Sequence, residues 1–340
     1  MLPILTNRRI GATHQPHRRR IGADAEAHVP EGDFCAWWGW WVAPIRRFVS
    51  IGNMDNGSQK RFARYVAIGD SSTAGLDDRD RNGHYRGWSR RLAERLAGVQ
   101  GELLYANFGV PGWSTRQILK RQVEPAAQLR PDLVTVFSGT NDVLERRFDA
   151  DRVRQDAEHI QRRFIDGGAT VLTFTLPDIR DVMPMARGLS PRIRALNEAL
   201  RAAAERTGAT LVDFAQYPVG SDPRLWSKDR LHANSHGHAR IADALSHALG
   251  LPGTDESWKV PLPPPELRTR REWLAAEVAW TRHYLLPWVG RWILNHFSED
   301  KCQPRQPTLQ PVEPRADVPG AVIPTAVISC TGQDERPSPE

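Results

Sequence analysis

Short apolar runs alternate with longer amphipathic segments through the middle of the chain. The runs are rich in β-branched residues and have the length of about five residues that is usual for buried parallel strands. They lie at 64–68, 102–107, 132–137, 169–175 and 209–213. Strands that alternate with helical segments are typical of α/β folds. The pattern therefore predicts five parallel strands in one sheet.

The segments between these runs have a helical period. Apolar residues recur every three or four positions, which places them on one face of a helix. One such set is Trp88, Leu92 and Leu96, and another is Leu189, Ile193, Leu196, Leu200 and Ala203. Ser190-Pro191 is a typical helix start and Gly208 a typical stop. With a last helix at about 235–249, the chain is predicted to form a three-layer α/β/α domain over 61–250.

The first sixty residues differ from this middle part. They show no sustained period and are rich in Arg, His and Gly, whereas Met54 precedes the first predicted strand by only ten residues. We interpret 1–60 as a disordered or mis-annotated extension, with translation starting at Met54. The alternative is a genuine disordered arm whose tryptophans, clustered at 37–41, bind a partner.

Three further segments follow the predicted domain. Residues 251–265 contain five prolines and are predicted to be a linker, whereas 301–340 have no period and are predicted to be a disordered tail. Between them, 266–300 form a predicted helical region, interrupted at Pro287, with four tryptophans among arginines. We expect these helices to pack on the domain as a structural support. A substrate lid or weak contact with a membrane surface are the alternatives.

Composition narrows the classes of function. The chain has 46 basic and 40 acidic residues, a diffuse excess that does not form the basic stripe of a nucleic-acid-binding protein. Its three cysteines, Cys35, Cys302 and Cys330, lie outside the predicted core and offer neither a disulfide framework nor metal-ligand spacing. We therefore predict a cytoplasmic protein without a metal or a cofactor. No glycine-rich nucleotide-binding loop is found either.

A serine follows the first predicted strand. The run at 64–68 leads into Gly69-Asp70-Ser71, which places the serine at the carboxyl edge of the sheet, where α/β folds bind ligands. By itself, Asp-Ser-Ser is equally consistent with a turn or a helix cap.

A nucleophilic serine needs a base, and the base needs an orienting group. Asp229 and His232 stand three residues apart before the last predicted helix, so the carboxylate can bind one imidazole nitrogen and leave the other free. His236 and His238 follow closely, and we expect them at the surface or at the helix N-terminus.

The reaction also needs hydrogen-bond donors for a developing oxyanion. Gly109 follows the second predicted strand and Asn141 follows the third. The N–H groups of Gly109 and Ser71 and the side-chain amide of Asn141 are the candidate donors. The alternative is that Gly-Val-Pro-Gly and Gly-Thr-Asn-Asp are only turns.

Taken together, Gly-Asp-Ser at 69–71, Gly109, Gly-Thr-Asn-Asp at 139–142 and Asp-x-x-His at 229–232 resemble the motifs of SGNH hydrolases, the GDSL-type esterases and lipases. The resemblance covers about 62–248 and implies a flavodoxin-like sheet of order 2-1-3-4-5. It implies Ser71 as nucleophile, Asp229 and His232 as its partners, and Ser71, Gly109 and Asn141 as the oxyanion hole. Ser72 stands where the motif has leucine, which leaves the subgroup open. Asp70 is expected to brace the loop.

The resulting hypothesis is a serine esterase that hydrolyses carboxylic esters of small or lipid-like substrates through an acyl-enzyme. The same triad could serve a thioesterase, an amidase or a carbohydrate deacetylase. A non-catalytic α/β module that binds a partner is the alternative from another class. The sequence leaves the natural substrate and the oligomeric state open.

Overall fold

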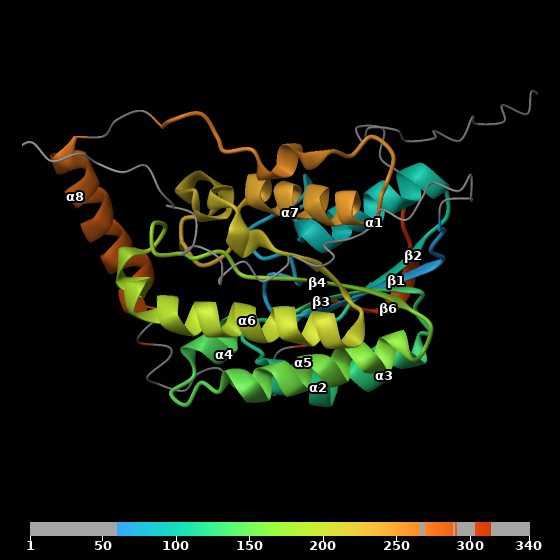
Figure 1. The fold of residues 1–340 in the computed structure, drawn as a ribbon. Coiled ribbons are helices and arrows are strands. Elements are labelled where there is room, and N and C mark those ends of the chain that lie inside the picture. Colours follow the sequence, from blue (N-terminus) through green and yellow to red (C-terminus); the bar gives the residue numbers. More distant parts are fainter. Residues whose placement is uncertain (1–59, 266–268, 288–289, 291–302, 314–340) are drawn as a thin grey trace, which may run out of the picture. The chain divides into compact units, whose positions relative to one another are not determined.

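A mixed six-stranded sheet forms the centre of the structure (Figure 1). The structure is a computed structural model that describes residues 60–265, 269–287, 290 and 303–313, so the prediction for 1–59 lies outside the described residues. The strand order is β5-β4-β3-β1-β2-β6. The strands are β1 Arg64–Gly69, β2 Leu104–Asn107, β3 Leu133–Phe137, β4 Thr170–Phe174, β5 Thr210–Val212 and β6 Gln306–Pro311.

The first five strands confirm the predicted parallel sheet and its 2-1-3-4-5 order. β1 lies at the centre, where Val66 pairs with Ala106 of β2 on one side and with Val134 of β3 on the other. Because the strand order reverses at β1, the crevice at its carboxyl end is the place where such folds bind ligands.

The sixth strand corrects the prediction of a disordered tail. β6 pairs antiparallel with β2, and Gln306 Nε2 donates to the Tyr105 carbonyl at 2.7 Å. Without β6, β2 would be an edge strand with unpaired N–H and C=O groups. The strand was not predicted from the sequence because it contains Pro307 and Pro311, although proline is tolerated in edge strands. Residues 314–340 lie outside the described part of the chain.

Helices cover both faces of the sheet (Figure 1). On one side lie α1 Gly87–Gln100 and α7 Ser235–Ala248. The other side carries α2 Thr115–Arg121, α3 Val123–Gln128, α4 Thr140–Leu144, α5 Ala150–Ile165 and α6 Ser190–Thr207. Short 3₁₀ helices lie at Pro184–Leu189, Phe214–Gln216, Pro218–Ser221, Pro223–Leu225 and Glu256–Lys259.

Alternation along the strands explains how both faces are buried. Val66 and Ile68 of β1 pack in one apolar cluster, whereas Tyr65 and Ala67 pack in the other. The predicted helix faces are buried as well, including Leu92 of α1. α6 ends at Gly208, whose φ of +83° suits glycine. These layers confirm the three-layer α/β/α architecture.

The segment predicted as a linker is attached to the domain. Trp258 is buried and packs edge-on against Phe214, with ring centroids 5.4 Å apart. Arg240 Nη1 donates to the carbonyls of Trp258 and Val260. A large apolar side chain among the prolines therefore fixes this segment against α7.

The C-terminal helical region contains α8, Arg270–Trp280, continued by a π-helical turn at Thr281–Leu285. Thr269 and Glu272 form a capping box that begins the helix. Trp280 is only 7% exposed, whereas Val278 is 66% exposed on the opposite face. In the described ranges, we find no helix with the length and apolar character needed to cross a bilayer. Contact of this region with a membrane surface stays a prediction.

Candidate active site

The loop after β1 is built around Gly69. Its φ is +154°, and a Cβ atom there would lie 2.2 Å from Thr73 Oγ1 and 2.4 Å from the Phe137 carbonyl oxygen. Only glycine fits this close approach. The buried Gln122 side chain accepts from the Gly69 N–H and donates to its carbonyl, both at 2.8 Å. These contacts fix the point from which the chain presents Ser71.

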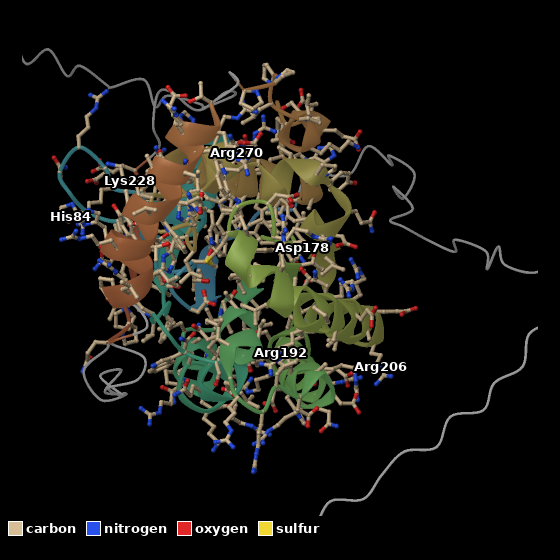
Figure 2. All side chains as sticks on the ribbon, turned by 90° about the vertical axis from the view of Figure 1, so that its left-hand side faces the viewer. His84, Asp178, Arg192, Arg206, Lys228 and Arg270 are labelled. Carbon is tan, nitrogen blue, oxygen red and sulfur yellow. The ribbon has the colours of Figure 1, made fainter. Side chains whose placement is uncertain are left out.

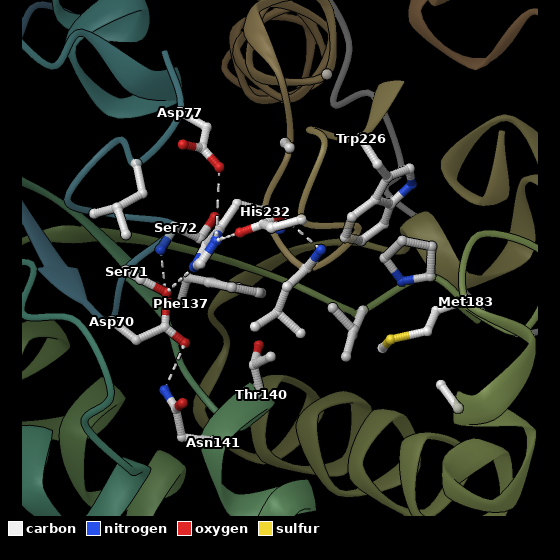
Figure 3. Close-up of a pocket in the computed structure, with 18 of the residues that line it drawn as sticks. Asp70, Ser71, Ser72, Asp77, Phe137, Thr140, Asn141, Met183, Trp226 and His232 are labelled. Atoms are coloured by element: carbon white, nitrogen blue, oxygen red, sulfur yellow. Dashed lines mark hydrogen bonds and ion pairs between the residues drawn. The ribbon is translucent and has the colours of Figure 1, made fainter. Parts of the chain in front are cut away.

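Ser71, His232 and Asp229 form a continuous chain of hydrogen bonds, of which Figure 3 labels Ser71 and His232. His232 Nε2 lies 2.9 Å from Ser71 Oγ, and His232 Nδ1 lies 2.6 Å from Asp229 Oδ2. The other Asp229 oxygen accepts from the N–H groups of Leu231 and His232 and from the hydroxyl of Ser227. The fold therefore brings the three predicted residues into the arrangement of a nucleophile, a base and an orienting carboxylate.

The carboxylate of Asp229 and the imidazole of His232 each stabilise the charged form of the other. Burial raises the pKa of Asp229, but its hydrogen bond to His232 and the charge of that ring outweigh burial and hold the pKa well below its usual range. Burial lowers the pKa of His232, but the hydrogen bond to Asp229 and the charges of Asp229, Asp77 and Asp70 raise it above 6.5 overall. Asp229 is therefore ionised, and His232 is a stronger base than free imidazole.

Gly109 does not take the place predicted for it. Its N–H donates to Asn107 Oδ1 at 2.8 Å, and a Cβ atom at Gly109 would lie 2.4 Å from the Ala74 nitrogen. The chain continues alongside β1 beyond Asn107, because the Val110 N–H still donates to the Gly69 carbonyl. The predicted donor role of Gly109 is therefore wrong: this glycine permits close packing of two loops.

Gly112 lies at the pocket instead, three residues further on. Its φ is +83°, and it lines the cavity next to Ser71. Within the described residues, the N–H groups of Gly112 and Ser71 donate to no other residue. The Asn141 amide also lines the cavity and donates to the Trp113 carbonyl at 3.0 Å, with a weak contact of 3.5 Å to Asp70. Gly112, Ser71 and Asn141 thus all lie in the wall of one cavity and are the candidate N–H donors there.

Two buried aspartates hold the loops that carry these donors. Asp70 accepts from the Ser72 N–H at 2.9 Å, which confirms its bracing role, and burial raises its pKa to about 7. Asp142 accepts from the N–H and the hydroxyl of Thr115, and burial raises its pKa to about 6. The Asp142 contact ties α4, which carries Asn141, to the start of α2.

His236 and His238 lie at the start of α7, as expected, but the burial of His238 is a structural feature that sequence reasoning missed. His238 is fully buried, where Nδ1 accepts from the Trp88 N–H at 3.2 Å and Nε2 lies 2.9 Å from the Leu76 carbonyl. Burial lowers its pKa to about 4, so the ring is neutral and supports the loop that follows Ser71. The helical spacing of His238, Ala242 and Leu245 was the signal that could have shown its burial.

A cavity of about 930 Å³ opens at Ser71 and His232. Much of its wall is apolar, as in Phe137, Leu144, Phe174, Met183, Leu189 and Trp226. Figure 3 shows Met183 and Trp226 across the pocket from Ser71. Among the polar atoms of this wall, the Thr140 hydroxyl is buried without a hydrogen-bond partner in the described part of the protein. The cavity can hold an apolar group beside the hydroxyl of Ser71.

Asp77 adds a second carboxylate to the site. One oxygen atom of Asp77 lies 3.9 Å from His232 Nδ1 and 2.7 Å from the Ser227 hydroxyl oxygen. Ligand-type atoms of Asp77, Asp229 and His232 all lie within 4.8 Å of one another, which a metal ion could use. Because Asp229 and His232 already bind each other and Ser71, we interpret the cluster as a triad with an additional charge beside it.

Several solved structures are similar to this chain. An α/β hydrolase from the metagenome of Lake Arreo, Spain, shows 25% identity and a TM-score of 0.49, over 57% of this chain and 99% of that one. An acetylxylan esterase from Geobacillus stearothermophilus shows 19% identity and a TM-score of 0.49, over 57% of this chain and 97% of that one. The lipase/acylhydrolase from Enterococcus faecalis shows 23% identity and a TM-score of 0.47, over 55% of this chain and 96% of that one.

The sequence itself matches a family profile. Among curated proteins, the chain has no significant match. The profile of the GDSL-like lipase/acylhydrolase family matches residues 67–240, just over half of the 340 residues, and this range includes Ser71, Asn141 and His232. The chain therefore belongs to the GDSL-like lipase/acylhydrolase family, and it is a serine hydrolase that acts on ester bonds.

Proposed function

We propose that this protein hydrolyses carboxylic esters through a covalent acyl-enzyme on Ser71. The single observation that carries the proposal is the hydrogen-bond chain from Ser71 Oγ through His232 to Asp229, which meets the open cavity. A serine hydroxyl aligned with an oriented imidazole is the arrangement that nucleophilic catalysis requires.

The chemistry follows from the placement of these atoms. Ser71 Oγ attacks the ester carbonyl carbon while its proton passes to His232 Nε2. The oxyanion is stabilised by the N–H groups of Ser71 and Gly112 and by the Asn141 amide. His232 then protonates the leaving alcohol, and the acyl group stays on Ser71. Water then attacks the acyl carbon while its proton passes to His232 Nε2, and His232 returns that proton to Ser71 Oγ as the bond between Oγ and the acyl carbon breaks, which releases the acid.

The wall of the cavity favours an apolar acyl group. Each methylene that leaves water contributes about 0.8 kcal/mol, so a chain lying along Phe137 and Met183 would bind more tightly than acetate. This observation favours esters with an apolar acyl chain over acetylated sugars. Thioester and amide substrates stay as alternatives, because they would use the same triad.

A panel of p-nitrophenyl esters from acetate to dodecanoate tests the proposal. We expect hydrolysis of all short members, and kcat/KM that rises with chain length until the cavity is filled. Thioester and anilide analogues of the best acyl group measure the competing activities. Absence of ester hydrolysis across the whole panel by a folded enzyme would contradict the proposed function.

A further inference from the structure

The C-terminal helix α8 contacts the loop that carries Asp229 and His232. Arg230 lies directly after Asp229, and its guanidinium donates twice to Glu277 of α8: Nη1 to Oε2 at 2.8 Å and Nη2 to Oε1 at 2.7 Å. Both side chains are about one-fifth exposed. Paired, charge-assisted hydrogen bonds of this kind fix geometry as well as distance. Figure 2 faces the side of the molecule on which α8 lies, with Arg270 labelled at its start.

A second contact binds the same loop to the same helix. The Arg230 guanidinium carbon lies 4.6 Å from the centre of the Trp280 ring, and Trp280 Nε1 lies 3.4 Å from the Asp229 carbonyl oxygen. Trp280 is buried and also lines the catalytic cavity. Stacking on an aromatic face holds the planar guanidinium in place. The helix therefore contacts both the residue that orients His232 and the residue that follows it.

The backbone at Arg230 needs such support. Its φ is +60°, in the left-handed region that residues other than glycine rarely adopt. This turn places Asp229 Oδ1 against the N–H groups of Leu231 and His232, and so aims Asp229 at the imidazole. A conformation that is unfavourable by itself persists when surrounding contacts fix it, and the contacts to α8 are available for that purpose.

We propose that Arg230 and Glu277 are positioning residues for the reaction: their ion pair, with Trp280 beneath it, holds the turn at Asp229 in its catalytic conformation. This inference rests on the proposed function of the triad. It makes the C-terminal helix a working part of the active site instead of a support for the core alone. Neither residue takes part in bond making or breaking, because both act through Asp229 and His232.

Point variants of the full-length chain test this proposal. We expect Glu277→Gln and Arg230→Gln each to lower kcat by about ten- to hundred-fold, because a small displacement of the base from the nucleophile is costly. The double variant should be no worse than Arg230→Gln, since both changes break the same pair. Glu205→Gln removes an exposed carboxylate on α6 and is the matched control, with kcat expected to stay unchanged.

The variant Arg230→Gly distinguishes the effect of the Arg230 side chain from the effect of the backbone conformation at this position. Glycine accepts a φ of +60° readily, so this variant keeps the turn accessible. It removes the contacts of the Arg230 side chain with Glu277 and Trp280, whereas the contact of Trp280 with the Asp229 carbonyl stays. The proposal expects Arg230→Gly to lose activity together with Glu277→Gln. Full activity of a folded Arg230→Gly variant would show that the turn does not need the contacts of the Arg230 side chain with the helix, and would overturn the proposal.

A readout without substrate distinguishes this proposal from the proposed function. The pKa of His232 is followed by NMR titration of its ring proton, assigned with His232→Gln. When the turn loosens, the bond to Asp229 weakens, so the pKa of His232 in Glu277→Gln should fall toward 6.5. That shift supports the pairing even if the wild type hydrolyses no ester. If the wild type is an esterase and Glu277→Gln changes neither kcat nor this pKa, the proposal is wrong and the function stands.

Discussion

Nδ1 of His232 lies 3.9 Å from a carboxylate oxygen of Asp77, beside the 2.6 Å contact that it makes with Asp229. The imidazole thus faces two acidic groups from different parts of the chain. Asp77 comes from the loop after the nucleophile, and Asp229 comes from the loop before α7. Ser227 connects the two carboxylates, because its hydroxyl lies within hydrogen-bond distance of both.

The first prediction concerns the pH dependence that Asp77 imposes. The base must be neutral to take the Ser71 proton, so kcat/KM falls as pH drops through the pKa of His232. Asp77 raises that pKa. We therefore expect Asp77→Asn to shift the acid limb of the kcat/KM profile to lower pH. Asp166→Asn, an exposed change at the end of α5, is the control and should leave the limb in place. An upward shift in Asp77→Asn would show that Asp77 acts by another route.

The second prediction concerns the oxyanion donor of Asn141. Asn141→Ala should lower kcat by about 10²–10³, equivalent to roughly 3–4 kcal/mol, with little change in KM, because the bond forms mainly to the transition state. Asn141→Asp keeps the shape but replaces the amide donor with a carboxylate that repels the oxyanion, so its loss should be at least as large. Steady-state kinetics on one p-nitrophenyl ester provide the measurement. A change confined to KM would instead assign Asn141 to binding of the substrate in its ground state.

The third prediction concerns protein stability and His238. Its pKa is about 4 in the folded state and about 6.5 when unfolded, so between these values the unfolded chain binds the extra proton. The free energy of unfolding therefore decreases as pH falls from 6.5 to 4, and the contribution of His238 to this decrease is about 3 kcal/mol. His238→Gln should remove that part of the slope, as measured by urea unfolding at several pH values. Equal slopes for both proteins would contradict a buried neutral His238.

The sequence predicted the sheet and the triad for a physical reason. Buried parallel strands are short, continuous apolar runs, and each candidate residue stood at the end of such a run or at a helix start. Ser71 and His232 are 161 positions apart in the chain, yet both had to come to the same edge of the sheet. Position relative to the strands placed both residues at that edge, and the resemblance to SGNH hydrolases implied their roles.

The sequence-based predictions were wrong or incomplete where the feature has no periodic pattern or motif in the sequence. Gly-Val-Pro-Gly offers two glycines, and only the hydrogen bond from the Val110 N–H to the Gly69 carbonyl shows that the chain still runs alongside β1 beyond Gly109. β6 lacks any apolar period because it is an edge strand containing Pro307. The contact between Arg230 and Glu277 joins a loop to a distant helix, and single charged residues carry no sign of their partner.

The role of β6 also changes how the C-terminal region should be tested. Truncation after Pro265 would remove α8 together with the strand that covers the edge of β2. Lower stability after such a truncation would therefore not show what the helix itself does. Point variants on α8 are the appropriate test.

The central claim is that Ser71 carries the acyl group. The most direct measurement is mass spectrometry of the enzyme after brief mixing with a p-nitrophenyl ester at low pH, where deacylation is slow, followed by mapping of the acylated peptide. We expect one acyl group on Ser71, the same adduct in Ser72→Ala, and none in a folded Ser71→Ala variant. An acyl group on any other residue, or full ester hydrolysis by Ser71→Ala, would contradict the account.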